Sequence, residues 1–481
     1  MISTKEMKIL EENSEYFGVS KLDLMENAGK NCADYIKTHF PGKSVLVVAG
    51  QGNNGGDGFV IARHLNCKIY FLGEESKLKH EAQVNFRKLN KIQFVNDIIE
   101  THIIVDCIFG AGFSLIGGLF VNVGKQGIPE PYFSVIKKIN KIKAYRISID
   151  IPSGLDADTG KWIGKADGFV KANLVLTLHD IKQGLNKSKT KFNTKIIPVG
   201  IPEKAITCVG PGDIKAVIHE RKPEAHKGDF GRVLLIASSE EYAGASVLVT
   251  KAVVNSLVAL RAGSDLVTVA APEKVAWAVN CLYADLITKK LSGKHIQKKH
   301  LLQLEPLIER SDVLLVGNGM GVHAETREFC SALMKKYPEK LKVIDADAIK
   351  MLRLQDISNA IITPHAREFE MLLENSGVVR DEAKDYVGSN VILLKGWIDQ
   401  IISGDKVTKV KGGNPGMSKA GTGDVLAGLC AGFLAQSRQI FESAEAAAHI
   451  NKKIGELLLT KKKGYSFIAS DMVEEISRQN D

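Results

Sequence analysis

Short apolar segments rich in valine, isoleucine and leucine recur along the chain, and turn residues follow most of them. In the first part of the chain these segments occupy residues 44–49, 102–106, 144–150, 173–178 and 195–198. Apolar residues at helical spacing precede or separate them, as in residues 1–31 and 59–65. Strands that alternate with helices favour a parallel α/β sheet.

The same alternation starts again after a polar, turn-rich stretch at residues 210–228. Further strands are expected at residues 233–237, 266–270, 312–317, 342–345, 361–363 and 390–395. Helices are expected at residues 243–261, 423–434 and 444–459. A chain of 481 residues is long enough for two to three domains. We therefore expect an α/β protein with two three-layer αβα domains, residues 1–212 and 213–481.

Residues 412–428, GGNPGMSKAGTGDVLAG, combine a glycine-rich loop with the start of an apolar helix. Glycines let the backbone approach a phosphate closely, and a helix N-terminus offers free N–H groups to it. Asp424 stands at that N-terminus, where a proton acceptor beside a bound phosphate would be needed. The alternative is that Asp424 caps the helix after a glycine turn.

Polar residues also follow the first strands. Residues 50–58 carry five glycines in nine residues with Asn54 and Asp57, and a helix is expected from residue 59. Two further strands end at Asp106 and Asp150, and Ser153 follows the second of them. Because ligands bind outside the carboxyl ends of parallel strands, these side chains should share one pocket. Their hard oxygen ligands suit a group 1 or group 2 cation rather than zinc.

Composition narrows the class of protein. Hydrophobic residues make up 44% and charged residues 25%, as in an ordinary soluble protein. No apolar run of membrane length and no leader segment is found, so we expect a cytoplasmic protein that binds no membrane. The formal charge is +9, but its lysines are dispersed, which argues against nucleic-acid binding. The seven cysteines are scattered without a CxxC pair, which argues against structural zinc and disulfides.

Two ordered sets of motifs then match known domains. NNGGDG at residues 53–58, the strand end at residues 106–112 and DIPSG at residues 150–154 resemble the NAD(P)HX epimerase domain, which is also called the YjeF N-terminal domain. The second half resembles the ribokinase-like NAD(P)HX dehydratase domain through HKGDFGRVL (226–234), GNGMG (317–321), DADAI (345–349), TPH (363–365), LKG (394–396) and the segment at 412–428. Together the motifs resemble the bifunctional NAD(P)H-hydrate repair family.

The resemblance implies a Rossmann-like first domain that interconverts the R and S hydrates of NADH and NADPH, called NADHX and NADPHX. It implies a second domain, a lyase, that dehydrates the S form with ADP as phosphoryl donor. Phosphorylation would turn the ring hydroxyl into a good leaving group. The implied cofactors are K⁺ in the epimerase and Mg²⁺ in the dehydratase. We also expect a homo-oligomer whose ligands are these hydrates and an adenine nucleotide.

The resemblance also assigns residues. In the first domain Asp150 would be the proton acceptor, and K⁺ would be bound by Asn54, Asp106 and Ser153. The substrate of this domain would contact Asn53, Asn54, Gly55, Gly56, Asp57, Gly110, Ala111, Gly112, Phe113, Ser114, Leu115, Ile116 and Asp150.

In the second domain Asp424 would be the catalytic base and a substrate contact. The hydrate would also contact Ala243, Gly319 and His365, and the nucleotide would contact Lys395, Gly396, Trp397, Ile398, Asp399 and Gly423. The chain departs from the family pattern at Asn318, where proline is usual, and at Arg367, where glycine is usual. Ser418 and Lys419 also replace smaller or uncharged residues, and Lys419 either contacts phosphate or faces solvent.

Two other functions stay open at this point. A ribokinase-like vitamin or sugar kinase with an accessory first domain would release a stable phosphorylated product. A binding module with an inactive first domain would bind RNA or a lipoprotein instead, which the intact Asp106 and Asp150 loops argue against.

Overall fold

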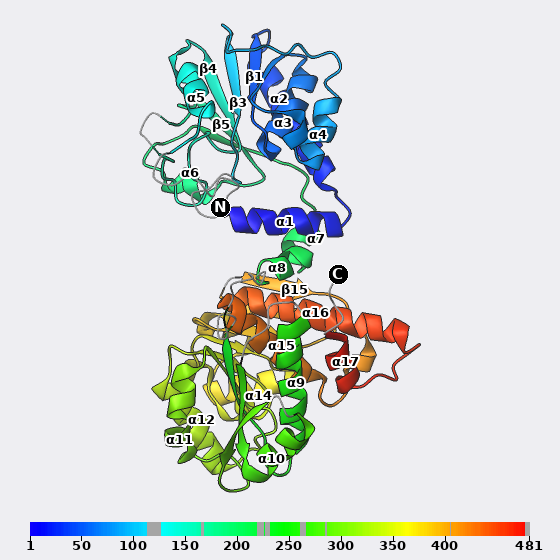
Figure 1. The fold of residues 1–481 in the computed structure, drawn as a ribbon. Coiled ribbons are helices and arrows are strands. Elements are labelled where there is room, and N and C mark those ends of the chain that lie inside the picture. Colours follow the sequence, from blue (N-terminus) through cyan, green and yellow to red (C-terminus); the bar gives the residue numbers. More distant parts are fainter. Residues whose placement is uncertain are drawn as a thin grey trace. The chain divides into compact units, whose positions relative to one another are not determined.

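The fold is described from a computed structural model of the chain. It describes residues 1–112, 127–164, 168–218, 226, 231–259, 266–283, 286–404 and 406–476, with the backbone alone for residues 253–259. The chain divides by packing into two units, Met1–Ile206 and Thr207–Asp481 (Figure 1). The predicted limits of the functional domains, 1–212 and 213–481, stay a prediction.

The described residues of the first unit form one parallel sheet with the strand order β2-β1-β3-β4-β5-β6. Its strands are β1 (Val45–Ala49), β2 (Lys68–Phe71), β3 (Ile103–Cys107), β4 (Tyr145–Ile149), β5 (Leu174–Leu178) and β6 (Thr194–Ile197). Its helices are α1 (Thr4–Tyr16), α2 (Lys21–His39), α3 (Asn53–Leu65), η1 (Glu75–Lys77), α4 (His80–Arg87), α5 (Tyr132–Lys141), α6 (Gln183–Lys187) and α7 (Glu203–Thr207).

Alternate residues of β1 enter two separate cores on the two faces of this sheet. Val47 packs on the side of α2 and α3, whereas Leu46 packs on the side of α5 (Figure 1). Side chains of successive strand residues point to opposite faces, so an unbroken apolar strand requires helices on both. This arrangement gives the three layers predicted from the sequence.

The second unit repeats this architecture with a larger sheet, in the order β15-β14-β13-β12-β11-β10-β7-β8-β9 among the described residues. Its strands are β7 (Arg232–Ile236), β8 (Leu266–Pro272), β9 (Ile287–Leu291), β10 (Val313–Val316), β11 (Leu341–Ile344), β12 (Ala360–Ile362), β13 (Val391–Leu394), β14 (Asp399–Ser403) and β15 (Lys406–Val410). Strands β14 and β15 run antiparallel, and the other pairs are parallel.

Helices cover both faces of the second sheet as well. They are α8 (Pro211–Lys215), α9 (Ala243–Ala259), α10 (Glu273–Leu282), α11 (His300–Arg310), α12 (Ala324–Lys336), α13 (Asp347–Met351), η2 (Leu354–Asp356), α14 (Ala366–Ser376), η3 (Arg380–Tyr386), η4 (Pro415–Met417), α15 (Thr422–Ser437), α16 (Ile440–Lys461) and α17 (Ala469–Ile476). Leu235 of β7 packs with α15 and α16, and Leu234 packs with α11 and α12. The predicted α/β class is therefore confirmed.

Three local predictions were wrong. Residues 1–31 do not form one helix, because the chain turns at Gly18 (φ 94°) and Ser20 caps a new helix, α2. The helix predicted from residue 59 begins at Asn53, with Gly52 as its N-cap, so NNGGDG is its first two turns. The second sheet is not entirely parallel, since its edge is the β14–β15 hairpin.

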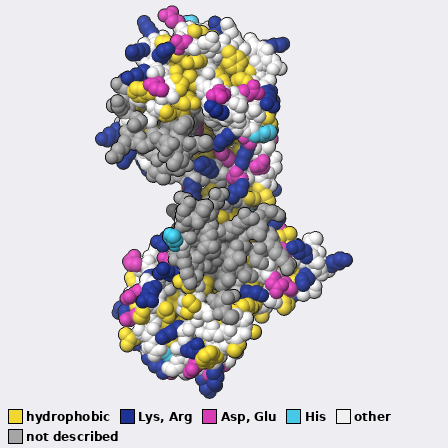
Figure 2. Space-filling view, in the orientation of Figure 1, with side chains coloured by type: hydrophobic (Ala, Val, Ile, Leu, Met, Phe, Trp, Pro, Cys, Tyr) yellow, Lys and Arg dark blue, Asp and Glu magenta, His cyan; other side chains and the backbone are white. Residues whose placement is uncertain are grey.

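The surface fits the interpretation of the net charge as dispersed. On the face shown in Figure 2, lysine and arginine side chains are scattered over both units among acidic, apolar and uncharged atoms. Within the described residues, no helix combines the length and apolar character that crossing a membrane requires.

Candidate active sites

Three polar side chains meet at the carboxyl ends of β1, β3 and β4. Strand β3 pairs with both β1 and β4, so residues after their ends become neighbours. Ser153 Oγ donates to Asp106 Oδ1 at 2.6 Å, and the Ser153 N–H donates to Oδ2 at 3.0 Å. Asn54 Nδ2 donates to the carbonyls of Phe109 (2.9 Å) and Ile149 (3.3 Å). The sequence thus predicted correctly that these loops converge.

This cluster holds oxygen atoms that suit a hard cation. Asn54 is buried, and its Oδ1 has no hydrogen-bond partner among the described residues. Burial raises the pKa of Asp106, although hydrogen bonds from Ser153 and Ser148 oppose the shift. A buried carboxylate and an unpaired amide oxygen are the donors that a K⁺ ion would satisfy. The residues present therefore fit the implied potassium ion.

Asp150 lies beside this cluster in a backbone conformation that non-glycine residues seldom adopt (φ 67°). Its carboxylate accepts from the N–H of Ala111 at 3.0 Å and lies 2.6 Å from the Lys182 ammonium. Lys182 is fully buried at the start of α6 and also donates to the Leu178 carbonyl at 2.5 Å. The strained backbone aims a charged side chain into the pocket.

Asp150 faces a cavity of about 340 Å³ that α1 covers. Asn53, Asn54, Asp57, Gly110, Ala111 and Gly112 also line it, together with Glu11 and Lys182, which sequence reasoning missed. Burial raises the pKa of Asp57 well above its usual range, and the carboxylates of Asp150 and Glu11 raise it further. Burial, followed by Asp150, also raises the pKa of Glu11. Phe113, Ser114, Leu115 and Ile116 lie outside the described residues.

Two glycines of NNGGDG serve close packing inside the protein. A Cβ on Gly55 would lie 1.9 Å from the Gly50 carbonyl oxygen, and one on Gly56 would lie 2.6 Å from the Met25 sulfur. Neither residue lines the cavity, whereas Asn53 and Asp57 do. The glycine content of this segment therefore follows from how tightly α3 joins β1 and α2.

The second unit gathers three polar residues where α15 meets the ends of β10 and β11. Asp424 lies in the first turn of α15, after the N-cap Gly421 (φ 88°). Asn318 Nδ2 donates to Asp424 Oδ1 at 2.7 Å and to Asp345 Oδ2 at 2.8 Å. Burial raises the pKa of Asp424 to about 7, with Asp345 adding to the shift. Asp424 is therefore no simple cap but half of a carboxylate pair, partly ionised near neutral pH.

Lys395 supplies positive charge to this pair. Its ammonium lies 3.1 Å from Asp345 Oδ1 and 3.8 Å from Glu368 Oε2. Burial lowers its pKa, but the two carboxylates outweigh burial and keep that pKa above its usual value. A Cβ on Gly423 would lie 3.4 Å from this ammonium, so Lys395 and Gly423 are adjacent, as their shared predicted role requires.

The remaining predicted residues surround this centre. Gly319 follows Asn318 and abuts the start of α9, where an added Cβ would lie 2.9 Å from the Tyr242 carbonyl oxygen, next to Ala243. The His365 side chain caps α14, and the backbones of His365 and Lys395 form an isolated parallel β-bridge. Lys395, Gly396, Trp397, Asp399 and Gly423 line a cavity of about 610 Å³ with His365, and Trp397 is 73% exposed.

Lys452 of α16 binds the backbone of residues that line this cavity. Sequence reasoning did not predict this role. Its buried ammonium donates to the carbonyls of Gly396 (2.8 Å) and Trp397 (3.3 Å) and lies 3.1 Å from Asp399. Asp399 accepts from the Gly396 N–H at 2.8 Å. These bonds fix the backbone of the 395–399 turn, which lines the cavity.

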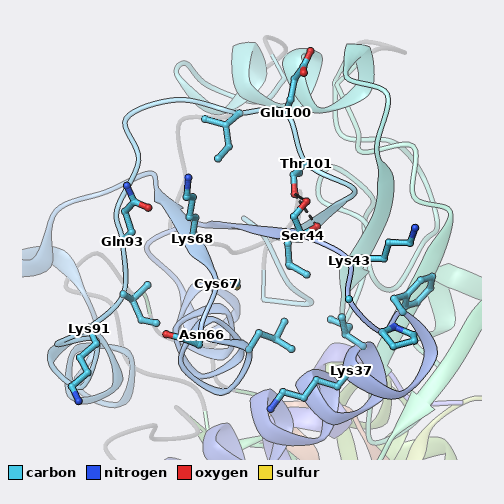
Figure 3. A pocket seen from close by; sticks show the side chains of 18 residues that line it. Lys37, Lys43, Ser44, Asn66, Cys67, Lys68, Lys91, Gln93, Glu100 and Thr101 are labelled. Carbon is cyan, nitrogen blue, oxygen red and sulfur yellow. Dashed lines mark hydrogen bonds between the residues drawn. The ribbon is translucent and has the colours of Figure 1, made fainter.

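A different hollow of the first unit lies at the opposite, amino ends of β1, β2 and β3, with a volume of about 760 Å³ (Figure 3). Four lysines border it, but the ammonium ends of Lys37, Lys43 and Lys91 point away from its middle (Figure 3). Diverging cations do not form an anion site, so the two centres above remain the candidates.

Comparison with known proteins matches a different family model to each half of the chain. Residues 21–184 match the family model described as YjeF-related protein N-terminus, and residues 233–478 match that described as NAD(P)H-hydrate dehydratase. A relative from Methanothermobacter thermautotrophicus, named bifunctional NAD(P)H-hydrate repair enzyme Nnr, is 37% identical over 98% of this chain and 93% of its own. This chain belongs to the bifunctional NAD(P)H-hydrate repair family.

Other relatives extend this family assignment. The proteins of the same name from Pyrobaculum aerophilum and Archaeoglobus fulgidus are each 37% identical over 99% of this chain and 97% of their own. Among solved structures, a ribokinase-like superfamily protein from Enterococcus faecalis V583 is 27% identical (TM-score 0.49; 56% of this chain, 94% of that chain). The Bacillus subtilis ADP/ATP-dependent NAD(P)H-hydrate dehydratase, co-crystallised with ATP/Mg²⁺, is 20% identical (TM-score 0.45; 56% and 97%).

Departures from the repair-family pattern can now be placed. Lys419 is exposed and lines the cavity of about 610 Å³, and its ammonium donates to the carbonyls of Tyr465 and Phe467. Arg367 is exposed in the first turn of α14. Asn318, by contrast, is fully buried between Asp345 and Asp424. Of these departures, Asn318 is the one that touches the candidate base.

Proposed function

We propose that this chain repairs hydrated nicotinamide nucleotides at two separate centres. The first unit epimerises R- and S-NAD(P)HX at Asp150, and the second dehydrates S-NAD(P)HX with ADP as phosphoryl donor. Membership of the repair family along the whole chain supports both activities. The observation that carries the second is the position of Asp424, a half-buried carboxylate in the first turn of a glycine-capped helix.

In the dehydratase, Asp424 removes the proton of the ring hydroxyl as that oxygen attacks the terminal phosphorus of ADP. The bond from this phosphorus to the AMP oxygen breaks. The resulting phosphate ester then leaves as inorganic phosphate while the adjacent ring carbon loses its proton, which restores NAD(P)H. A pKa of about 7 lets Asp424 accept the first proton near neutral pH. The N–H groups of residues 421–423 stabilise the transferring phosphoryl group.

The nucleotide occupies the cavity of about 610 Å³. Lys395 places its ammonium beside Gly423, where it balances phosphate charge, and exposed Trp397 offers a face for adenine. Within the described ranges, no group of three or more His, Cys, Asp or Glu side chains could hold a metal ion. Mg²⁺ would enter this cavity with the nucleotide and would supply positive charge to its phosphates.

In the epimerase, Asn54, Asp106 and Ser153 would hold K⁺, which would supply positive charge near a substrate phosphate. Asp150 accepts a proton from the substrate, and Lys182 fixes its carboxylate at 2.6 Å. Burial and the neighbouring carboxylates raise the pKa of Asp57, which favours its protonated form as a hydrogen-bond donor in the same cavity. A homo-oligomeric state stays a prediction, which light scattering would test.

The test is to incubate the protein with mixed R- and S-NADHX and ADP or ATP, with and without K⁺, and to follow the absorbance of restored NADH. Full recovery of NADH requires both activities, since S-specific dehydration alone stops when the S form is consumed. Recovery with ADP supports the proposal. A stable phosphorylated product without NADH would support a ribokinase-like kinase instead.

A further inference from the structure

Asn318 is a fully buried amide between two carboxylates of the dehydratase centre. It follows β10, and its neighbours come from other elements: Asp345 follows β11, and Asp424 lies in α15. Its single side-chain nitrogen donates to both carboxylates, at 2.8 and 2.7 Å. The Ser238 N–H donates to the Asn318 carbonyl at 2.8 Å, which fixes the backbone at this point.

The chemistry of the cluster determines which way the amide faces. Asn318 Oδ1 has no partner among the described residues, although it is buried. Reversing the amide would place this oxygen against two carboxylate oxygens, which repel it, whereas the nitrogen offers one hydrogen to each. A leucine or a proline at this position would have no side-chain donor. The Asn318 amide is therefore a hydrogen-bond donor shared by the two carboxylates.

We propose that Asn318 is a positioning residue of the dehydratase, whose amide holds the Asp424 carboxylate against Asp345 in the geometry of a base. The proposal rests on the proposed function of Asp424. Without the amide, Asp424 keeps the repulsion of Asp345 but loses the donor that offsets it. The carboxyl is then protonated at a higher pH and is free to rotate away from the hydroxyl.

Among the described residues, charged and polar groups of several elements act on the Asp424 carboxyl. Burial and the charge of Asp345 raise its pKa, and Asp347 at the start of α13 raises it slightly further. The hydrogen bond from Asn318 and the charge of Lys395, which follows β13, lower it. Since the net result is about 7, removing the Asn318 donor moves the pKa of Asp424 above neutrality.

The experiment measures the rate of S-NADHX dehydration against pH for the full chain and for Asn318→Leu and Asn318→Pro. Leucine keeps the branched shape of asparagine without a donor, and proline removes the donor with a smaller side chain. In both variants we expect the acid limb of the profile to move up by about one pH unit. The rate near pH 7 should fall about fivefold and recover at higher pH.

Three controls separate the possible outcomes. Thermal unfolding followed by circular dichroism reports whether the second unit of each variant is folded, and Asn280→Leu replaces a partly buried asparagine of α10, whose amide donates to the Leu286 carbonyl. Asp424→Asn tests the proposed function itself: if that variant still dehydrates its substrate, the role of Asp424 is wrong. If Asp424→Asn is inactive, an unmoved acid limb in both Asn318 variants overturns this inference alone. A uniform loss at all pH values, without a shift, overturns it equally.

Discussion

The Lys182 ammonium lies 2.6 Å from the Asp150 carboxylate, and both side chains are buried at the carboxyl end of the first sheet. Glu11 and Asp57 face the same cavity, and the charge of Lys182 opposes the rise in pKa of both carboxyl groups. This compensation is what allows an acidic site to exist in a desolvated pocket.

The first prediction concerns this cation. Lys182→Met should lower the free energy of unfolding of the first unit by about 3 kcal/mol at pH 7, because it leaves buried carboxylates unpaired. It should also abolish epimerisation, whereas dehydration of purified S-NADHX should continue. Urea unfolding followed by circular dichroism measures the first effect. The proposed role of Lys182 fails if unfolding and epimerisation both match the wild type.

The second prediction uses the raised pKa of Asp57. A group that binds its proton more tightly in the folded state stabilises it below the unfolded pKa and loses that contribution as pH rises through the folded pKa. Asp57→Asn should therefore stabilise the first unit at pH 7, by about 1 kcal/mol or more, and have little effect near pH 3. Thermal unfolding at both pH values tests this. Equal changes at both would show that burial does not penalise the Asp57 charge.

The third prediction concerns the potassium site. Asn54→Leu removes the unpaired buried oxygen, so the concentration of K⁺ that half-activates epimerisation should rise at least tenfold. Thermal stabilisation of the wild type by K⁺, against an organic cation at equal ionic strength, should disappear in the variant. Stabilisation by K⁺ that persists in Asn54→Leu would place the ion elsewhere.

The fourth prediction tests how the nucleotide cavity is built. Lys452→Met removes the donor to the carbonyls of Gly396 and Trp397, so the KM for ADP should rise about tenfold with a smaller change in kcat. Lys453→Met is the matched control, since that lysine is half-exposed and its ion pair is with Glu456. Equal KM values for the two variants would show that the bonds from Lys452 to the 395–399 turn do not shape the nucleotide cavity.

The sequence predicted those site residues whose positions follow from strand order and from the chemistry of the loops. Asn54, Asp106 and Ser153 lie at or just after the carboxyl ends of parallel strands, so their convergence could be predicted. Asp424 was predicted from the glycines before an apolar helix. Lys182, Glu11 and Lys452 could not be found this way, because their roles depend on contacts with residues distant in sequence. Each resembles an ordinary helix-surface charge until the helix is packed.

Asn318 and residues 53–58 also show that the role of a residue depends on its three-dimensional neighbours. A departure from the family pattern was visible at Asn318, but its effect depends on where Asp345 and Asp424 lie in space. The glycines of residues 53–58 were interpreted as a ligand loop, whereas Gly55 and Gly56 are required where α3 contacts Gly50 and Met25. Close packing and ligand binding select glycine for the same physical reason, which is the absence of a Cβ.

The most direct measurement of the central claim is ADP-dependent conversion of purified S-NADHX to NADH by Asp424→Asn, with R/S interconversion assayed in the same sample. The base should contribute about 10²–10⁴-fold, so dehydration should fall by that factor while epimerisation at Asp150 continues at the wild-type rate. Near-wild-type dehydration by Asp424→Asn would contradict the assignment of this carboxylate as the base.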